Sequence, residues 1–186
     1  LCHADPHNGV LIFAALDDGF RWARLDALRD PHHFTSLTRT LDKLHHSGLP
    51  LPSHSRQQDM LQLRLQVETH GVQLPEELQW MGECVDLAWE ALSAASFTPV
   101  LIHGDNIASN WMVNAQGEWR LLDFDYAARG DAWHDIATLI HAQLPTDDRC
   151  RDVILSSLVE CTEPDCVLGR LFALADDYLL TVWALL

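Results

Sequence analysis

Acidic and amide side chains follow short apolar runs in the middle of this sequence. His103-Gly104-Asp105 comes directly after Val100-Leu101-Ile102, and Asn110 lies five positions beyond Asp105. Asp123-Phe124-Asp125 follows a later apolar run. Polar groups that emerge directly after buried strands are held on rigid supports, where metal and catalytic sites are usually built. We therefore expect the chemistry of this chain to lie in this stretch.

The spacing of these residues indicates phosphoryl transfer. The interval from Asp105 to Asn110 equals that of the protein-kinase catalytic loop, in which His-Arg-Asp is followed by four residues and an asparagine. In such a site an aspartate orients the accepting hydroxyl group and takes its proton. An asparagine and a later aspartate, here Asp123, hold the magnesium that neutralises charge on the transferred phosphate.

Three segments together resemble the aminoglycoside phosphotransferase and choline kinase family, which has a protein-kinase-like fold. The resemblance implies that Asp105 is the catalytic base and that Asn110 and Asp123 are the magnesium ligands. It further implies that Asp135 braces the catalytic loop from the helix that follows. The segments that carry it are His103-Gly104-Asp105-x4-Asn110, residues 122–127 and residues 130–137, with a looser similarity in the Leu44-His45 end of an earlier helix.

Several other positions support this resemblance. We expect His103 to be a hydrogen-bonded scaffold residue, because the adjacent aspartate already supplies the acid-base group. Asp125 replaces the protein-kinase glycine and Gly104 replaces its arginine, which points to a small-molecule substrate rather than a protein. By the same resemblance Ala14, Ala15 and Leu16 would form the hinge that faces the adenine ring.

The resemblance implies ATP and Mg²⁺ as cofactors and an alcohol group as acceptor. We expect a cationic acceptor such as choline, ethanolamine or thiamine, or an aminoglycoside. The chain has 12 Lys and Arg against 27 Asp and Glu, a net charge of −15, which suits a cation and argues against binding to nucleic acid or to an anionic membrane. Asp123-Phe124-Asp125-Tyr126 is also more similar to choline, ethanolamine and thiamine kinases than to drug-modifying members.

The sequence departs from the family where the nucleotide phosphates would be bound. It has no glycine-rich phosphate loop, and its single lysine, Lys43, lies in a predicted helix beyond the hinge. We therefore expect residues 1–16 to be a remnant of the small lobe, namely a hairpin and the hinge. Residues 17–186 would be the helical catalytic lobe, cut within its last helix, and this chain alone would be a poor or inactive kinase.

Other functions fit less well or remain open. Asp123 and Asp125 after a strand could serve a phosphatase that forms a phosphoaspartate, but Ala127 replaces a hydroxyl residue and no lysine follows. His134-Asp135 could bind metal in a hydrolase, but no other histidine has a spacing that forces convergence on it. A catalytically silent kinase-like binding module would also lack the phosphate loop and the lysine, and remains an alternative.

The predicted architecture is α+β, a mostly helical lobe with a small β insert that carries the catalytic loop. A turn at residues 5–9 begins a hairpin, and Trp80 and Trp89 share one helical stripe that we expect to be buried. The predicted strands are residues 10–16, 100–102, 111–113 and 119–122. The predicted helices run from Pro31, capped by Asp30, to Gly48, over 60–67, from Pro75 to about 92, and over 132–144, 149–160 and 164–186.

The cysteines and the apolar runs bear on localisation. Five cysteines without a Cys-x-x-Cys pair favour a reduced, cytoplasmic setting. The longest apolar stretch, Tyr178 to Leu186, is about half of what a membrane span needs, and no signal peptide opens the chain. We therefore expect no membrane partner, and the sequence leaves the oligomeric state open.

Overall fold

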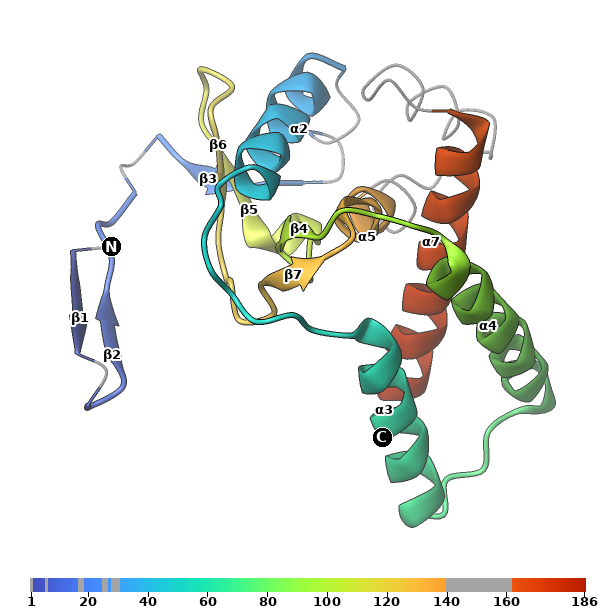
Figure 1. Ribbon diagram of the computed structural model, residues 1–186. Helices are drawn as coiled ribbons and strands as arrows, with labels where there is room; N and C mark the ends of the chain where they lie inside the picture. The colour runs from blue at the N-terminus through green and yellow to red at the C-terminus, as the bar shows by residue number, and fades with distance from the viewer. Residues whose placement is uncertain (1, 6, 17–18, 25–26, 28–30, 140–161) are drawn as a thin grey trace.

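The computed structural model describes residues 2–5, 7–16, 19–24, 27, 31–139 and 162–186. It combines small antiparallel sheets with longer helices (Figure 1), which confirms the α+β prediction. Within the described residues, no helix is long and apolar enough to cross a membrane.

The chain opens with a hairpin of β1 (His3–Asp5) and β2 (Val10–Ile12), as the turn sequence predicts. Asp5 Oδ1 accepts hydrogen bonds from the backbone nitrogens of His7 and Asn8, and Gly9 has a φ of 65°. The prediction of a strand as far as Leu16 was wrong, because the three residues of β1 pair only with residues 10–12. Figure 1 shows the hairpin standing apart from the rest of the fold.

Two further sheets carry the predicted β insert. The predicted strands 100–102, 111–113 and 119–122 are confirmed, the last one residue shorter, but two short strands that pair with them were missed. These have too few residues for an alternating pattern to reveal them. The strands are β3 (Arg21–Trp22), β4 (Val100–Ile102), β5 (Trp111–Val113), β6 (Trp119–Leu121) and β7 (Ala128–Gly130), arranged as β3-β5-β6 and β4-β7.

The helices begin where local capping groups favour them. Ser55 caps α3 by accepting a hydrogen bond from Gln58 N, so this helix starts before the predicted Met60. Thr162 and Asp165 form a capping box on α7. The predicted cap Asp30, the helix over 149–160 and the end of the helix over 132–144 lie outside the described residues. The helices are α2 (Pro31–His45), α3 (Arg56–Thr69), α4 (Glu76–Ala94), the 3-10 helix η1 (Ala108–Asn110), α5 (Ala132–Ala137) and α7 (Glu163–Trp183).

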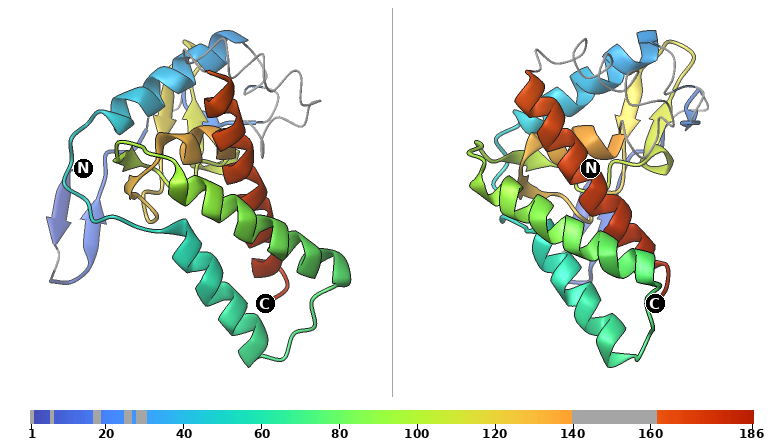
Figure 2. Two further views of the ribbon diagram at one scale, coloured as in Figure 1. Left: turned by 45° about the vertical axis from the view of Figure 1, so that its right-hand side comes forward. Right: turned by 90° about the vertical axis from the view of Figure 1, so that its right-hand side faces the viewer.

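Two apolar clusters hold these elements together. In one, Leu37 and Leu41 of α2 pack with Trp111, Val113 and Trp119 of the three-stranded sheet. In the other, α3 and α4 pack with α7, and α7 also contacts α5 (Figure 2). The helices of the second cluster thereby cover the side of the fold opposite α2, with the catalytic loop between the two clusters.

One expectation about the core was wrong. Trp89 is buried, with 7% of its surface exposed, but Trp80 is 64% exposed. The two residues lie nine positions apart on α4, and only one side of that helix packs against α7 and α3. At about 100° per residue, nine positions place the two side chains about 180° apart, so they lie on opposite faces of α4 and do not share one stripe.

Candidate active site

The catalytic loop begins at His103, directly after β4, and the His103 side chain joins it to the segment after β6. His103 Nδ1 lies 3.3 Å from the backbone nitrogen of Asp105, and Nε2 lies 2.9 Å from the backbone oxygen of Leu122. Because Nδ1 must accept and Nε2 must donate, these contacts require the neutral tautomer protonated at Nε2. With both nitrogens engaged and the ring buried, His103 has the position of a scaffold residue.

Asn110 holds the half-buried Asp105 in place. Its Nδ2 donates to Asp105 Oδ2 at 2.9 Å and to the Asp105 backbone oxygen at 2.8 Å. Both amide protons are thus used within the loop. The oxygen of the Asn110 amide remains as a ligand for a cation, on the same side chain that orients the Asp105 carboxylate.

A backbone hydrogen bond brings Asp123 to the same place. Leu122 N donates to Asn110 O at 2.9 Å, so the residue after Leu122 emerges beside the catalytic loop. Asp123 has a φ of 63°, the only positive φ at a described residue other than glycine. Such left-handed backbone at a residue with a side chain costs free energy and clusters at functional sites. Asp125 lies two residues further on and is exposed.

These oxygen donors suit Mg²⁺. Among the described residues no three His, Cys, Asp or Glu side chains gather closely enough to hold a metal alone. Mg²⁺ does not need such a cage, because it usually binds one or two carboxylates together with substrate phosphates and waters. Asp123 and Asn110 would hold the ion, which would neutralise charge on the transferred phosphate.

Asp135 braces the loop from α5, as the resemblance implies. Its fully buried carboxylate accepts hydrogen bonds from the backbone nitrogens of His103 (2.8 Å) and Gly104 (3.0 Å), and from His45 Nε2 (2.9 Å). Burial alone would raise the pKa of Asp135, but the hydrogen bond from His45 and the nearby His134 charge outweigh it and lower that pKa. The carboxylate therefore stays ionised and keeps all three donors.

Two residues of this arrangement, Asn106 and His45, are not predicted as site residues by the sequence pattern, and only the structure gives the steric reason for Gly104. Buried Asn106 donates to the Asp135 backbone oxygen at 2.8 Å and accepts from Trp111 Nε1 at 2.6 Å. His45 was noted only as part of a helix ending. Gly104 has a φ of 82°, and a Cβ on it would lie 2.4 Å from the Tyr126 backbone oxygen, so close approach of two backbones requires this glycine.

Ala14, Ala15 and Leu16 lie in the segment between β2 and β3, where Ala14 and Ala15 are exposed. The structure thus gathers His103, Asp105 and Asn110 in one loop. Asp135 is joined to this loop by hydrogen bonds, and Asp123 follows Leu122, whose backbone is hydrogen-bonded to the loop. The partner of His134, by contrast, is Asp176 of α7, at 3.1 Å. The adjacent His134-Asp135 pair therefore does not form one metal site.

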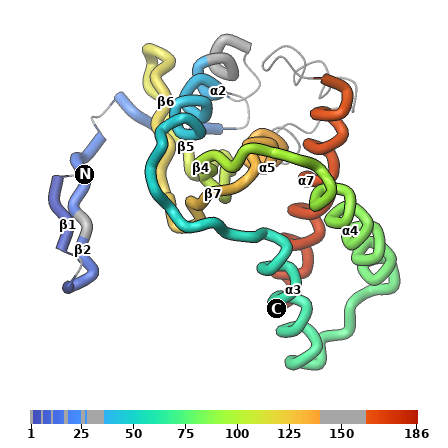
Figure 3. Tube along the Cα trace, viewed as in Figure 1, coloured from blue at the N-terminus to red at the C-terminus, as the bar shows by residue number. Residues whose placement is uncertain are grey.

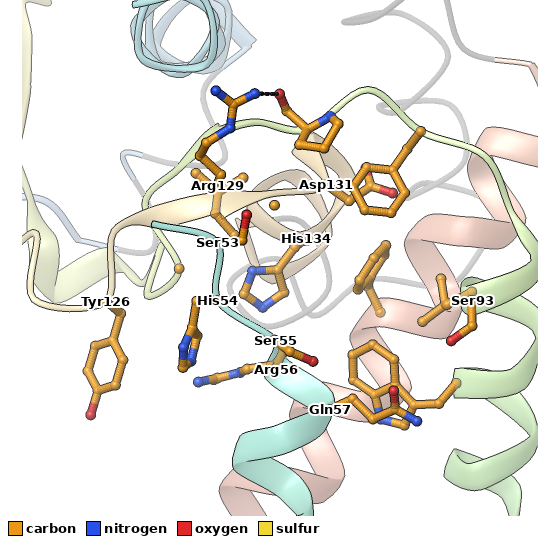
Figure 4. A pocket seen from close by; sticks show the side chains of 18 residues that line it. Ser53, His54, Ser55, Arg56, Gln57, Ser93, Tyr126, Arg129, Asp131 and His134 are labelled. Carbon is orange, nitrogen blue, oxygen red and sulfur yellow. Dashed lines mark hydrogen bonds between the residues drawn. The ribbon is translucent and has the colours of Figure 1, made fainter. Parts of the chain in front are cut away.

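A pocket of about 280 Å³ lies beside the catalytic loop, at Gly104 and Tyr126 (Figure 4). Ser53, His54 and Ser55, which precede α3, line one part of it. The extended chain between α2 and α3 (Figure 3) is held by a hydrogen bond from Arg129 N to Pro52 O at 3.0 Å. The apolar lining of the pocket includes the rings of Trp89, Phe97 and Phe172. Gly104, which lines the pocket, directly precedes Asp105 in the sequence.

A buried ionic network underlies this pocket. Asp176 of α7 binds Arg56 Nε of α3 at 3.0 Å, His134 of α5 at 3.1 Å and Thr138 Oγ1 at 2.7 Å. Burial would raise the pKa of Asp176 and lower that of His134, but the attraction between the two side chains prevails. The pKa of Asp176 is therefore lowered and that of His134 raised, and both shifts favour the ion pair between the two side chains.

The fold is similar to that of several solved structures of kinases and phosphotransferases. The chain superposes on a choline/ethanolamine kinase family protein from Mesorhizobium loti with a TM-score of 0.85 and 18% identity, over 98% of this chain and 62% of that one. The choline kinase LicA from Streptococcus pneumoniae gives 0.74 and 16%, over 90% and 59%. Aminoglycoside 2'-phosphotransferase-IIIa in complex with GDP gives 0.56 and 18%, over 83% and 60%.

The chain therefore has a protein-kinase-like fold, and it spans about three fifths of the length of these neighbours. No curated protein sequence matches it significantly. The phosphotransferase enzyme family matches residues 15–159, and the chain belongs to that family.

Proposed function

We propose that this chain supplies the catalytic loop and the metal ligands of an ATP-dependent kinase that phosphorylates an alcohol group of a small molecule. The observation that carries the proposal is the Asp105 carboxylate, fixed by Asn110 at 2.9 Å on a loop that Asp135 anchors. Membership of the phosphotransferase enzyme family supports it. So do two structural neighbours, which are complexes with the nucleotides AMP and GDP.

Each residue has a defined task in this proposal. Asp105 accepts a hydrogen bond from the acceptor hydroxyl group and takes its proton as the oxygen attacks the terminal phosphate. Asn110 and Asp123 hold Mg²⁺ against the nucleotide phosphates. His103, Asp125 and Asp135 support the loop and its metal side, and Ala14, Ala15 and Leu16 face the adenine ring. Residues 103–110 contain no Arg or Lys that could bind the nucleotide phosphates.

We further propose that the acceptor is a cationic alcohol such as choline, ethanolamine or thiamine, or an aminoglycoside. Aromatic rings attract ammonium groups through their negative faces, and the pocket beside Asp105 contains Trp89, Phe97, Phe172 and Tyr126. Choline kinases and a kanamycin complex of an aminoglycoside phosphotransferase are among the structural neighbours.

The test is Asp105→Asn in the complete protein that contains this chain. We expect phosphotransfer to fall at least about 100-fold, the usual contribution of a general base, with the melting temperature nearly unchanged. Asp42→Asn, at an exposed position on α2, is the matched control and should retain activity. Near-normal turnover by Asp105→Asn would remove this residue from the mechanism.

A catalytically silent binding module is the second candidate. It is favoured by one observation, that the only lysine, Lys43, lies exposed on α2, and no glycine-rich loop occurs in this sequence. Both candidates predict that residues 1–186 alone are a poor or inactive kinase. The complete protein separates them: turnover of ATP with any of the proposed alcohols supports the kinase, and small-molecule binding without turnover supports the module.

A further inference from the structure

The polar lining of the pocket beside Gly104 consists mostly of hydrogen-bond donors. Arg56, Arg129 and His134 contribute cationic groups, and Asp131 is the one carboxylate among the lining residues that the structure describes. Asp131 is already engaged, since it caps α5 by accepting a hydrogen bond from Trp133 N at 2.9 Å. The balance of charged groups at this site is thus opposite in sign to the net charge of the chain, −15.

Two of the donors are buried and have no partner. His134 is 4% exposed and Trp89 is 7% exposed, and neither His134 Nδ1 nor Trp89 Nε1 has a hydrogen-bond partner among the described residues. The Asp176 charge raises the pKa of His134 against the effect of burial, which favours the doubly protonated ring, in which Nδ1 is a donor. Unsatisfied buried donors cost about 1–3 kcal/mol each, which a ligand acceptor would relieve.

The charges around the pocket are only partly matched. Asp176 alone is shared between Arg56 and His134, at 3.0 and 3.1 Å. Asp59 lies 3.7 Å from Arg56 Nη1 but has its closer contact, 2.7 Å, with His54. Arg129 donates to the Pro99 backbone oxygen at 2.9 Å at the pocket rim (Figure 4), and no carboxylate of the described residues pairs with it.

The position of these donors links them to the catalytic loop. Figure 4 shows the His134 ring among the pocket side chains, close to Ser55 and Arg56, which precede and begin α3. Gly104, which lines the same pocket, is adjacent in sequence to Asp105. A small molecule that places an acceptor group against the donors would therefore extend to the reactive end of the loop.

We propose that this pocket binds a carboxylate of the acceptor, so that the acceptor is a cationic alcohol that also carries a carboxylate group. Arg56 and Arg129 supply charge, His134 and Trp89 supply N–H groups, and the aromatic rings hold the remainder of the molecule. That the bound molecule is the phosphate acceptor rests on the proposed kinase function. The carboxylate site itself is tested by binding alone.

The first experiment compares alcohols that differ by a carboxylate. Calorimetric titration of the complete protein, without ATP, uses serine against ethanolamine and carnitine against choline. We expect the carboxylate compound of at least one pair to bind about tenfold more tightly than its partner, equivalent to about 1.4 kcal/mol. If both carboxylate compounds bind no more tightly than their partners, or do not bind, the proposal is overturned.

The second experiment removes the charges. Arg129→Gln and Arg56→Gln should each weaken binding of the carboxylate compound about tenfold and change binding of its partner less than about twofold. Arg39→Gln, at an exposed position of α2 outside the pocket, should change neither. Arg56→Gln leaves Asp176 short of a partner, so its melting temperature is measured as well, and Arg129→Gln is decisive if that variant unfolds. Unchanged carboxylate binding in Arg129→Gln and in folded Arg56→Gln overturns the proposal.

Asp105→Asn separates this proposal from the kinase function. The variant loses the contact with the acceptor hydroxyl group but should keep the preference for the carboxylate compound over its partner, because Asp105 does not line the pocket. Carboxylate-selective binding without phosphorylation of any alcohol would sink the kinase proposal and sustain the site. Phosphorylation of ethanolamine or choline without carboxylate selectivity would do the reverse.

Discussion

At the scale of single residues, the catalytic loop depends on backbone geometry as much as on its polar side chains. Gly104 and Asp123 both adopt positive φ values, 82° and 63°. Gly104 allows the backbone to pass close to the backbone of Tyr126. Asp123 follows Leu122, whose backbone nitrogen donates to Asn110 O. Asp123, the residue with the unfavourable backbone conformation, is also a proposed metal ligand. Such conformations cluster at functional sites.

Gly104→Ala should destabilise the protein markedly. The new Cβ would lie 2.4 Å from the Tyr126 backbone oxygen, so one of two backbones must move. We expect a loss of at least about 3 kcal/mol in the free energy of unfolding, measured by urea denaturation. Gly71→Ala is the matched control, since Gly71 has a φ of 66° but nothing within 4 Å of its Cβ position, and should cost about 1 kcal/mol. Equal losses in the two variants would contradict the steric argument.

At the scale of elements, Asp135 connects α5 to α2 and to the catalytic loop. Its three donors come from two residues of the loop after β4 and from the last residue of α2. A carboxylate on one short helix thereby fixes the position of a loop thirty residues earlier in the chain. Asp135 therefore acts on the loop by positioning its backbone.

His45→Ala should therefore lower the stability of the protein and remove one of the contacts that hold Asp135 against the loop. It removes a 2.9 Å hydrogen bond to a fully buried carboxylate, which we expect to cost about 2 kcal/mol in the free energy of unfolding. His46→Ala, next in sequence but with its side chain 74% exposed, should cost less than about 0.5 kcal/mol. The measurement is chemical denaturation of both variants side by side, and a similar loss in each would contradict the bracing role.

At the scale of the whole molecule, the Asp176 network ties α3, α5 and α7 together beneath the pocket. Arg56, His134 and Thr138 reach Asp176 from the other two helices and the residue after α5. Breaking a buried ion pair by removing one partner leaves an uncompensated charge and is costly. The pocket and the helical cluster therefore depend on the same charges.

This network predicts a stability maximum at mildly acidic pH. The lowered pKa of Asp176 contributes stability fully above its ordinary value of 3.8, and the contribution is lost as pH falls through the folded pKa below that value. The raised pKa of His134 contributes stability fully below its ordinary value of 6.5, and this is lost as pH rises through the folded pKa above it. The melting temperature should therefore fall on both sides of this window.

Asp176→Asn is the control for this prediction. The variant should melt at a lower temperature within the window, and its melting temperature should depend less on pH on both sides of it, because the amide does not titrate. The measurement is a series of thermal melts from acid to mildly basic pH for both proteins. If the two proteins show the same pH dependence, other groups control it.

The sequence by itself determined the features that neighbouring residues encode. The Asp105-to-Asn110 interval, the turn before Gly9 and the helix that begins at Pro75 follow from spacing, turn chemistry and capping within a few positions. The family resemblance and the α+β class followed from the same local patterns. These predictions held because a local pattern acts wherever the segment finally packs.

Only the tertiary structure decided which distant residues meet. His45 and Asp135 are separated by 90 positions, and Arg56 and Asp176 by 120. A pattern of neighbouring residues therefore cannot predict either pair. The pairing of β4 with β7, the exposure of Trp80 and the donor-rich pocket have the same origin. Each depends on which faces of separate elements pack together, and that is set by burial and charge over the whole chain rather than by any one segment.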